Sequence, residues 1–325
     1  MPRFEFWREV FTLRGSATPL IIGRLLGFTL FAAVVTAVMT YLGMTHILAN
    51  SHYEYIGAVL ALLLVLRTNA GYDRWYEARK VWGGIVNQSR NLGQIGVIYG
   101  PQDPQWRESY LRWVAAFSAV CRHSLRKQFS FDEIKDLVKI VGRVEAERLA
   151  NCNHMPMYVV RRIAELLKQA VEDSQLDRFY FLKAEEERAR LIDHIGMCER
   201  ILATPLALAF SIKIRRFLFL YLTFLPLALV DYVGAFTPLM TLLVAYPLLS
   251  LDQIGVELQD PFSHRRLNHL PLGDISTMIR NNLFASLEDL PKMVPFEERD
   301  MEIEINEIRK PNTIRTFAVN STLSS

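Results

Sequence analysis

The chain has 325 residues, of which 51% are hydrophobic and 22% are charged. The apolar share is high for a soluble protein, and the charged share excludes a chain immersed in lipid along its whole length, so we expect a molecule divided between bilayer and water. Basic residues are spread along the chain and give a net charge of only +3, which argues against a nucleic-acid partner.

The first 18 residues mix arginine, glutamate and aromatic side chains, and they contain no apolar core of the kind found in a signal peptide. Phe4, Trp7 and Phe11 recur at helical spacing. Two interpretations stay open for this segment. It is either an amphipathic helix lying on a membrane surface or an ordinary helix packed in a core.

Two apolar runs follow in close succession. Residues 25–44 carry no charge and match the roughly 20 residues that a helix needs to cross a bilayer, so they are predicted to form the first transmembrane helix. Residues 56–66 are apolar but short, because Glu54 and Arg67 bracket them only about 18 Å apart along a helix. This run is either a buried helix of a soluble core or a spanning helix inside a bundle. Its place directly after a clear span favours the second.

Residues 67–200 contain no further spanning run and show helical periodicity. Apolar positions recur in two stripes: Trp82, Ile85, Leu92, Ile95 and Val160, Ile163, Leu166, Leu167, Val171. A loop is expected at residues 100–105, and Pro156 is expected in the first turn of a helix. The sequence therefore predicts a large helical region in the cytosol rather than a linker.

The third and fourth apolar runs, residues 217–230 and 234–251, are separated by three residues and predict a tight helical hairpin. The turns between paired runs, residues 45–55 and 231–233, contain no Lys or Arg, whereas the opposite ends of all four runs do. The positive-inside rule therefore places both termini and the central region in the cytoplasm. The end of the chain is rich in Ser, Thr and Asn, and we expect it to be partly disordered.

Three segments resemble those of bacterial bestrophin homologues, in the same order: residues 67–93, 198–211 and 251–272. With the four apolar runs, the resemblance covers residues 5–290. It implies an all-α integral membrane protein with four transmembrane helices per subunit and a large helical cytosolic domain, assembled as a homopentameric ring around one axial pore. The family motif residues, to which we assign structural roles, are Arg74, Trp75, Asp260, Pro261 and Phe262.

In that family the second membrane helix lines a hydrophobic neck, whose residues lie four apart and end eight positions before the Arg of an Arg-Trp dipeptide. Here the dipeptide begins at Arg74, so the resemblance assigns the neck to Ala58, Leu62 and Leu66, which share one helix face. Ala58 departs from the usual bulky residue, and we expect the outer ring to be wider. The alternative is that Leu62 and Leu66 are ordinary packing residues.

The family has a second constriction in the cytosolic region, formed by a large apolar residue about 19 positions before a Cys-Glu-Arg segment. Counting back from Cys198 assigns it to Phe179. Phe181 and Leu176 stay open, because the local alignment can shift by about two residues. An aromatic residue of the core is the other interpretation.

Animal members of the family bind calcium at an acidic cluster after the Asp-Pro-Phe motif. Here the motif is followed by SHRRLNHL, and His and Arg cannot supply the oxygen ligands that calcium requires. We therefore expect no calcium site, and no other metal or cofactor. Cys121, Cys152 and Cys198 form no CxxC pair, which argues against a disulfide framework or a zinc site.

The resemblance implies an ion channel for small monovalent ions and not an enzyme. Anions such as chloride are the family default, and monovalent cations such as sodium are equally open in the bacterial branch, because a neck of Leu and Ala carries no fixed charge. The alternatives are a secondary transporter, disfavoured because the third and fourth spans lack charged midplane residues, and a membrane-anchored scaffold. The expected location is the inner (cytoplasmic) membrane of a bacterium, with the lipid bilayer and other copies of the chain as partners.

Five parts are expected along the chain. An N-terminal segment and the first two transmembrane helices are followed by a cytosolic helical region, the second pair of transmembrane helices, a cytosolic C-terminal helical region and the tail. In order, these parts are residues 1–75, 76–212, 213–251, 252–290 and 291–325.

Overall fold

The structure is a computed structural model that describes residues 7–8, 10–12, 15–43, 50–205 and 207–288. The chain divides into two compact units, residues 1–286 and 287–325. Of the second unit, only Leu287 and Glu288, at the end of the last helix, are described. All regular elements within the described residues are helical, which confirms the predicted all-α class. The tail that was expected to be partly disordered lies outside them.

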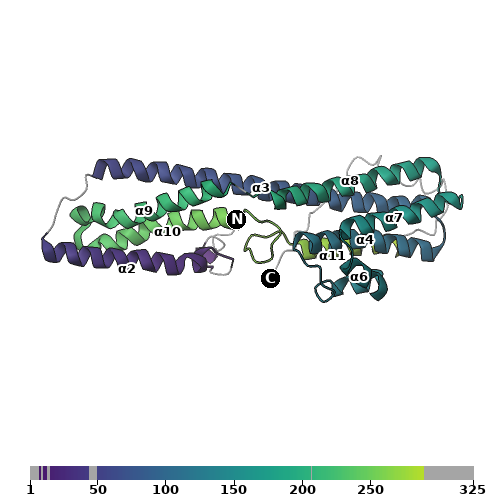
Figure 1. The fold of residues 1–325 in the computed structure, drawn as a ribbon, viewed down its shortest axis with the longest axis horizontal. Coiled ribbons are helices and arrows are strands. Elements are labelled where there is room, and N and C mark those ends of the chain that lie inside the picture. The colour runs from purple at the N-terminus through teal and green to yellow at the C-terminus, as the bar shows by residue number, and fades with distance from the viewer. Residues whose placement is uncertain (1–6, 9, 13–14, 44–49, 206, 289–325) are drawn as a thin grey trace, which may run out of the picture. The chain divides into compact units, whose positions relative to one another are not determined.

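The elements in chain order are α2 (Thr18–Leu42), α3 (Asn50–Tyr99), α4 (Pro104–Leu125), α5 (Lys135–Val141), α6 (Arg143–Ala150), α7 (Met155–Glu172), α8 (Arg178–Ala203), α9 (Leu208–Val233), η1 (Gly234–Phe236), α10 (Thr237–Glu257) and α11 (Leu272–Glu288). Helices α2, α9 and α10 pack against one another, and α9 and α10 also pack against α3. Helices α4, α7 and α8 form a second group, in which α4 and α8 also pack against α3 (Figure 1). Helix α3 therefore belongs to both groups.

Three helical stretches of the described chain are long and apolar enough to cross a membrane: Thr18–Leu42, Tyr53–Tyr99 and Ala209–Glu257. The last stretch contains both α9 and α10, which the short turn η1 joins directly, so the predicted helical hairpin is present. Helix α2 begins seven residues before the expected start of the first apolar run. This extension is accommodated because Arg24, inside the helix, donates hydrogen bonds to Gln253 Oε1 at 2.7 Å and to the Leu20 carbonyl at 3.2 Å.

Side chains from all four helices of the first group form one apolar core. Its buried members are Ile21, Leu25, Leu60, Leu64, Ile214, Leu218, Leu222, Leu225, Ala245, Leu248 and Leu249. They recur at three- and four-residue intervals on each helix, the spacing that places side chains on one face. Since each helix contributes only one face to this core, the opposite faces stay exposed within the single chain.

Helix α3 has 50 residues and contains no proline, so nothing in its sequence breaks the backbone hydrogen bonding between the two groups. Its second half approaches neighbouring helices closely at three glycines. A Cβ at Gly84 would lie 2.3 Å from the His194 ring on α8, one at Gly93 would lie 2.2 Å from Leu283 on α11, and one at Gly96 would lie 2.3 Å from the Tyr110 ring on α4. A larger residue would clash at these positions, which explains why α3 has glycine there.

The second group confirms the predicted apolar stripes. On α3, Trp82, Ile85, Leu92 and Ile95 are all buried. On α7, Val160, Ile163 and Leu167 are buried, and Leu166 and Val171 are partly buried. Pro156 lies in the first turn of α7, as expected.

The loop expected at residues 100–105 is two residues shorter than predicted. Helix α4 already begins at Pro104, because the Asp103 carboxylate accepts hydrogen bonds from the backbone N–H groups of Gln105 and Trp106 at 3.0 and 3.3 Å. An Asp cap followed by proline at the first helical position is a favoured helix start.

Part of the N-terminal aromatic segment is described. The Trp7 and Phe11 rings stack with their centroids 6.4 Å apart, and both side chains are exposed. Their exposure argues against packing in the core of their own subunit and is consistent with a membrane-surface segment. Phe4 lies outside the described residues.

Candidate pore surface

The neck positions assigned from the sequence lie on the face of α3 that points away from the chain's own core. Leu62 and Leu66 are 59% and 51% exposed, and Ala58 is also exposed. Leu60 and Leu64, on the opposite face, are buried in the core of the four apolar helices. Leu62 and Leu66 therefore do not belong to the apolar core that the described residues of the chain form.

Beyond Leu66 the same face of α3 becomes mainly polar. At 100° of rotation per residue, eight exposed residues point within about 40° of the direction of the assigned neck positions, and six of them are polar or charged. The eight are Asn69, Asp73, Tyr76, Lys80, Asn87, Asn91, Gln94 and Ile98. Asp73 forms no ion pair within the described chain, and the Lys80 Nζ lies 5.6 Å from the centre of the Tyr76 ring. One face of a single helix thus changes from apolar to mainly polar and charged.

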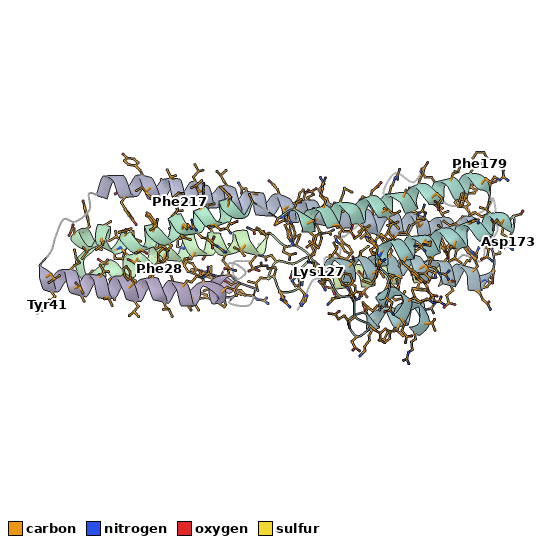
Figure 2. All side chains as sticks on the ribbon, in the orientation of Figure 1. Phe28, Tyr41, Lys127, Asp173, Phe179 and Phe217 are labelled. Atoms are coloured by element: carbon orange, nitrogen blue, oxygen red, sulfur yellow. The ribbon has the colours of Figure 1, made fainter. Side chains whose placement is uncertain are left out.

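Phe179 is the most accessible of the three candidates for the cytosolic constriction. Its side chain is 81% exposed at the start of α8 (Figure 2), whereas Leu176 is 4% exposed and Phe181 is partly buried. The exposure of Phe179 argues against a core role within its own subunit. Next to it, the Tyr180 ring stacks on Tyr99 with centroids 3.8 Å apart. This stack holds the start of α8 against the end of α3, so Phe179 lies close to the far end of the polar face.

Arg74 and Trp75 connect the three segments that resemble bacterial bestrophin homologues, residues 67–93, 198–211 and 251–272. The Arg74 guanidinium donates hydrogen bonds to the carbonyls of Gln259, at 2.6 Å, Thr204 and Ile201. These carbonyls follow or end α10 and α8, where helical carbonyls lack partners within their own helix. The Trp75 indole N–H donates to the Asn268 carbonyl at 2.8 Å. The dipeptide therefore ties α3 to the ends of two other helices.

The Asp-Pro-Phe motif forms the turn after α10. The Asp260 carboxylate accepts hydrogen bonds from the backbone N–H groups of Phe262 and Ser263 at 3.3 and 3.2 Å. Pro261 and Phe262 are buried, and the Phe262 carbonyl accepts a hydrogen bond from Arg126 Nε at 3.1 Å. These contacts give the motif a role in holding the turn. Within the described residues, no three His, Cys, Asp or Glu side chains gather closely enough to hold a metal ion.

The three cysteines are separate thiols. Cys121 and Cys198 are buried and Cys152 is partly buried. Burial raises the pKa of Cys198 to about 12, and burial likewise raises the pKa of Cys121 well above its usual value. Both buried thiols are therefore protonated and poorly nucleophilic at neutral pH.

The structure adds one charged centre that the sequence interpretation did not identify. Asp252 on α10 is buried and forms an ion pair with Arg67 on α3. Arg215 on α9 approaches the same carboxylate to 3.4 Å, and Arg24 on α2 approaches it to 3.9 Å. One carboxylate thus links all four apolar helices. The available signal was the recurrence of an arginine at the same end of three apolar runs, with a single acidic residue at the end of the fourth.

Comparisons with known proteins agree with this architecture. A family model described as bacterial/fungal bestrophin protein matches residues 1–285. A voltage-dependent anion channel-forming protein of Mesorhizobium japonicum is 33% identical over 302 residues, covering 91% of this chain and 95% of its own length. A voltage-dependent anion channel-forming protein of Nostoc is 34% identical over 297 residues, covering 90% and 94%. The crystal structure of a bacterial bestrophin homologue from Klebsiella pneumoniae superposes with a TM-score of 0.75 at 27% identity, covering 83% of this chain and all of that one.

Proposed function

Since this chain belongs to the bacterial and fungal bestrophin family, we propose that it assembles with copies of itself into a channel that passes small monovalent anions such as chloride. Its relatives in Mesorhizobium japonicum and Nostoc carry the name of anion channel-forming proteins. The assembly is a closed homopentamer in the inner membrane of a bacterium. Both termini and the central helical region lie in the cytoplasm, and α2, the first part of α3, α9 and α10 cross the bilayer.

The observation that carries this proposal is the exposed face of α3. Leu62 and Leu66 are uncovered in the single chain, and they lie in the part of α3 that is apolar enough to cross a membrane. Around a central axis, these side chains meet their equivalents from the other subunits and need no lipid. A narrow ring of leucines resists wetting and blocks ions without a plug. Ala58 forms the wider outer end of this neck.

The polar face beyond the neck supports the same arrangement. Exposed Asn, Asp, Lys and Gln side chains suit a water-filled vestibule, because they interact favourably with hydrated ions. Phe179, held near the end of α3, narrows the vestibule again at its cytosolic end. Ions on this path pass an apolar neck, a polar vestibule and an aromatic ring.

Assembly is tested by multi-angle light scattering of the detergent-purified protein, with correction for bound detergent. The expected protein mass is about five times the 37.4 kDa of one chain. A monomer or dimer under mild extraction rules out both the ring and the pore.

Selectivity is tested by the reversal potential of purified channels in planar bilayers under asymmetric NaCl. The anion channel is expected to reverse close to the chloride equilibrium potential. A reversal close to the sodium potential identifies a cation channel, the second candidate. The exposed carboxylate of Asp73 beyond the neck favours that candidate, whereas Lys80 on the same face favours the first.

A secondary transporter fits the structure less well. Residues 217–230 and 237–251 of α9 and α10 carry no charged side chain, whereas coupled transport relies on ionisable groups near the bilayer midplane. Absence of macroscopic current together with saturable uptake into proteoliposomes is the result that supports transport over conduction.

A further inference from the structure

Two apolar hollows meet on the outer surface of α9. The first, of about 330 Å³, lies between α2 and α9, and the second, of about 460 Å³, lies along the first turns of α9. Arg24, Gly27, Phe28, Phe31, Phe219 and Thr223 line the first, and Ile212, Arg215, Arg216, Phe219 and Leu220 line the second. Phe219 belongs to both, and its ring lies 6.1 Å from that of Phe28. Together the hollows form a groove, the α2–α9 groove, that is apolar except for Thr223 and for the arginines at one end.

Positive charge is in excess at that end. Arg24, Arg67 and Arg215 surround the single carboxylate of Asp252, which is 1% exposed and already paired with Arg67. Arg216 is exposed and makes no ion pair or hydrogen bond with any residue that the structure describes. Three guanidinium groups surround one carboxylate, and Arg216 adds a fourth positive charge. The positive charge at this end of the groove is therefore not neutralised, and an anion is expected to bind there.

The arginines lie at the depth of lipid headgroups. From Arg24 to the end of α2 at Leu42 the helix rises about 27 Å, and from Arg216 to the end of α9 at Val233 it rises about 26 Å. Both distances are close to the roughly 30 Å thickness of the hydrocarbon core. The charged end of the groove is therefore at the bilayer surface, and Phe31, seven residues beyond Arg24, lies about 10 Å deeper, at the level of acyl chains.

We propose that the α2–α9 groove binds an anionic phospholipid of the cytoplasmic leaflet. Its phosphate lies between Arg216 and Arg24, and one acyl chain lies along Phe219 and Phe28. This site is independent of ion conduction. A second copy of the chain fits the groove less well, because the nearest carboxylates of α10, Asp252 and Glu257, are both buried and engaged within their own subunit. A lipid supplies the required anion and the apolar chain in one molecule.

The test is native mass spectrometry of the purified oligomer, with dioleoyl phosphatidylglycerol and dioleoyl phosphatidylcholine as competing probes. Their acyl chains are identical, so a difference in retention reports the headgroup. Arg216→Gln removes the unpaired cation. Gly27→Leu places a side chain in the groove without displacing neighbouring residues, because a Cβ at Gly27 meets nothing within 4 Å. Gly23→Leu is the matched control, one turn earlier on α2, equally open and outside both hollows.

The wild-type oligomer is expected to retain phosphatidylglycerol about fivefold more than phosphatidylcholine, and Arg216→Gln is expected to remove most of that preference. Gly27→Leu is expected to reduce retention of both lipids, and Gly23→Leu to leave it unchanged. Equal retention of the two lipids by the wild type, or equal behaviour of the two glycine variants, overturns the proposal. Loss of the oligomer in Gly27→Leu alone also overturns it, because the groove is then a subunit interface. Lipid adducts are counted by mass, so these outcomes do not depend on whether the oligomer conducts ions.

Discussion

Arg67 and Asp252 form an ion pair, with 1% of each side chain exposed, that joins α3 to α10 one residue beyond the last neck leucine. Buried charges of this kind are strongly destabilising when one partner is lost, although a matched apolar pair in their place is often tolerated. Because Arg24 and Arg215 share the same carboxylate, Asp252 fixes the relative positions of the four apolar helices.

Replacing Asp252 alone is expected to destabilise the folded subunit severely. In Asp252→Asn the three arginines lose the only anionic partner that they have among the described residues, and we expect the free energy of unfolding to fall by about 3–5 kcal/mol. The measurement is the thermal unfolding midpoint of the detergent-solubilised protein. In the control, Arg67→Met combined with Asp252→Leu, the unpaired charge is removed, and the midpoint is expected to recover in large part. A double variant less stable than Asp252→Asn contradicts this account.

Shortening the neck side chains is expected to open the channel. Leu62→Ala and Leu66→Ala widen the apolar ring and lower the barrier to water, so conductance or open probability rises while assembly is retained. Ala58→Leu is expected to do the reverse. Single-channel recording in planar bilayers measures both effects.

Leu60→Ala is the matched control for the neck variants. Leu60 is buried in the core of the four apolar helices, so its truncation is expected to lower stability by about 2–5 kcal/mol and leave the conductance of the remaining channels unchanged. If Leu60→Ala opens the channel and both neck variants do not, the pore face is assigned to the wrong side of α3.

Phe179→Ala is expected to raise conductance without loss of stability. The side chain is exposed in the subunit, so its removal leaves no cavity and widens the cytosolic constriction. Leu176→Ala, three residues earlier at a buried position, is expected to lower the unfolding midpoint instead. Unchanged currents in Phe179→Ala remove the second constriction from the proposed path.

Asp73→Asn is expected to move the reversal potential toward that of chloride. One ring of carboxylates, about 10 Å beyond Leu66, attracts cations to the inner mouth of the neck, and its neutralisation removes that bias. Lys80→Gln, on the same face, is expected to shift the potential in the opposite direction and by less, because it lies about 10 Å further from the neck. Identical reversal potentials in all three proteins exclude the vestibule charges as determinants of selectivity.

Lowering the pH is expected to weaken the contact of Asp136 on α5 with His123 and Arg122 on α4. Burial raises the pKa of Asp136, but the hydrogen bond and charge of His123, at 2.8 Å, together with Arg122 outweigh it and lower that pKa to about 2. Because this value is below the usual 3.8, the carboxylate stabilises the fold above about pH 4, and the contribution disappears as the pH falls toward 2. The wild type and Asp136→Asn are therefore expected to differ in unfolding midpoint at pH 5 and to converge below about pH 3. A difference that persists at low pH contradicts this assignment.

Periodicity predicted the two apolar stripes that are buried on α3 and α7. Trp82, Ile85 and Leu92 were expected to share a stripe, and they do so because a long amphipathic helix has only one way to bury its apolar face.

The start of α2 was misjudged, because Arg24 was taken as the edge of an apolar run. A charge is tolerated inside such a helix when a side chain from another helix, here Gln253, accepts its hydrogen bond. No local pattern reveals such a distant partner.

The candidate pore positions came from the resemblance, and the structure adds which way they face. From spacing alone, Leu62 could not be distinguished from Leu60, since both are leucines in an unbroken apolar run. Only the positions of α9 and α10 decide which of the two is buried. The contacts of Asp252 escaped detection for a similar reason, because its partners are 37, 185 and 228 residues away in the chain.

In the proposed channel, the proline-free α3 connects the neck to the cytosolic constriction. Arg74, which donates hydrogen bonds to three carbonyls of neighbouring elements, lies between Leu62 and Tyr99 along the helix. A tilt of about 5° around it displaces Leu62 by about 1.6 Å and Tyr99 by about 3.3 Å in the opposite direction, given the helical rise of 1.5 Å per residue. Since the Tyr99 ring stacks on Tyr180, next to Phe179, the proposed channel couples a movement at Phe179 to one at the neck through α3.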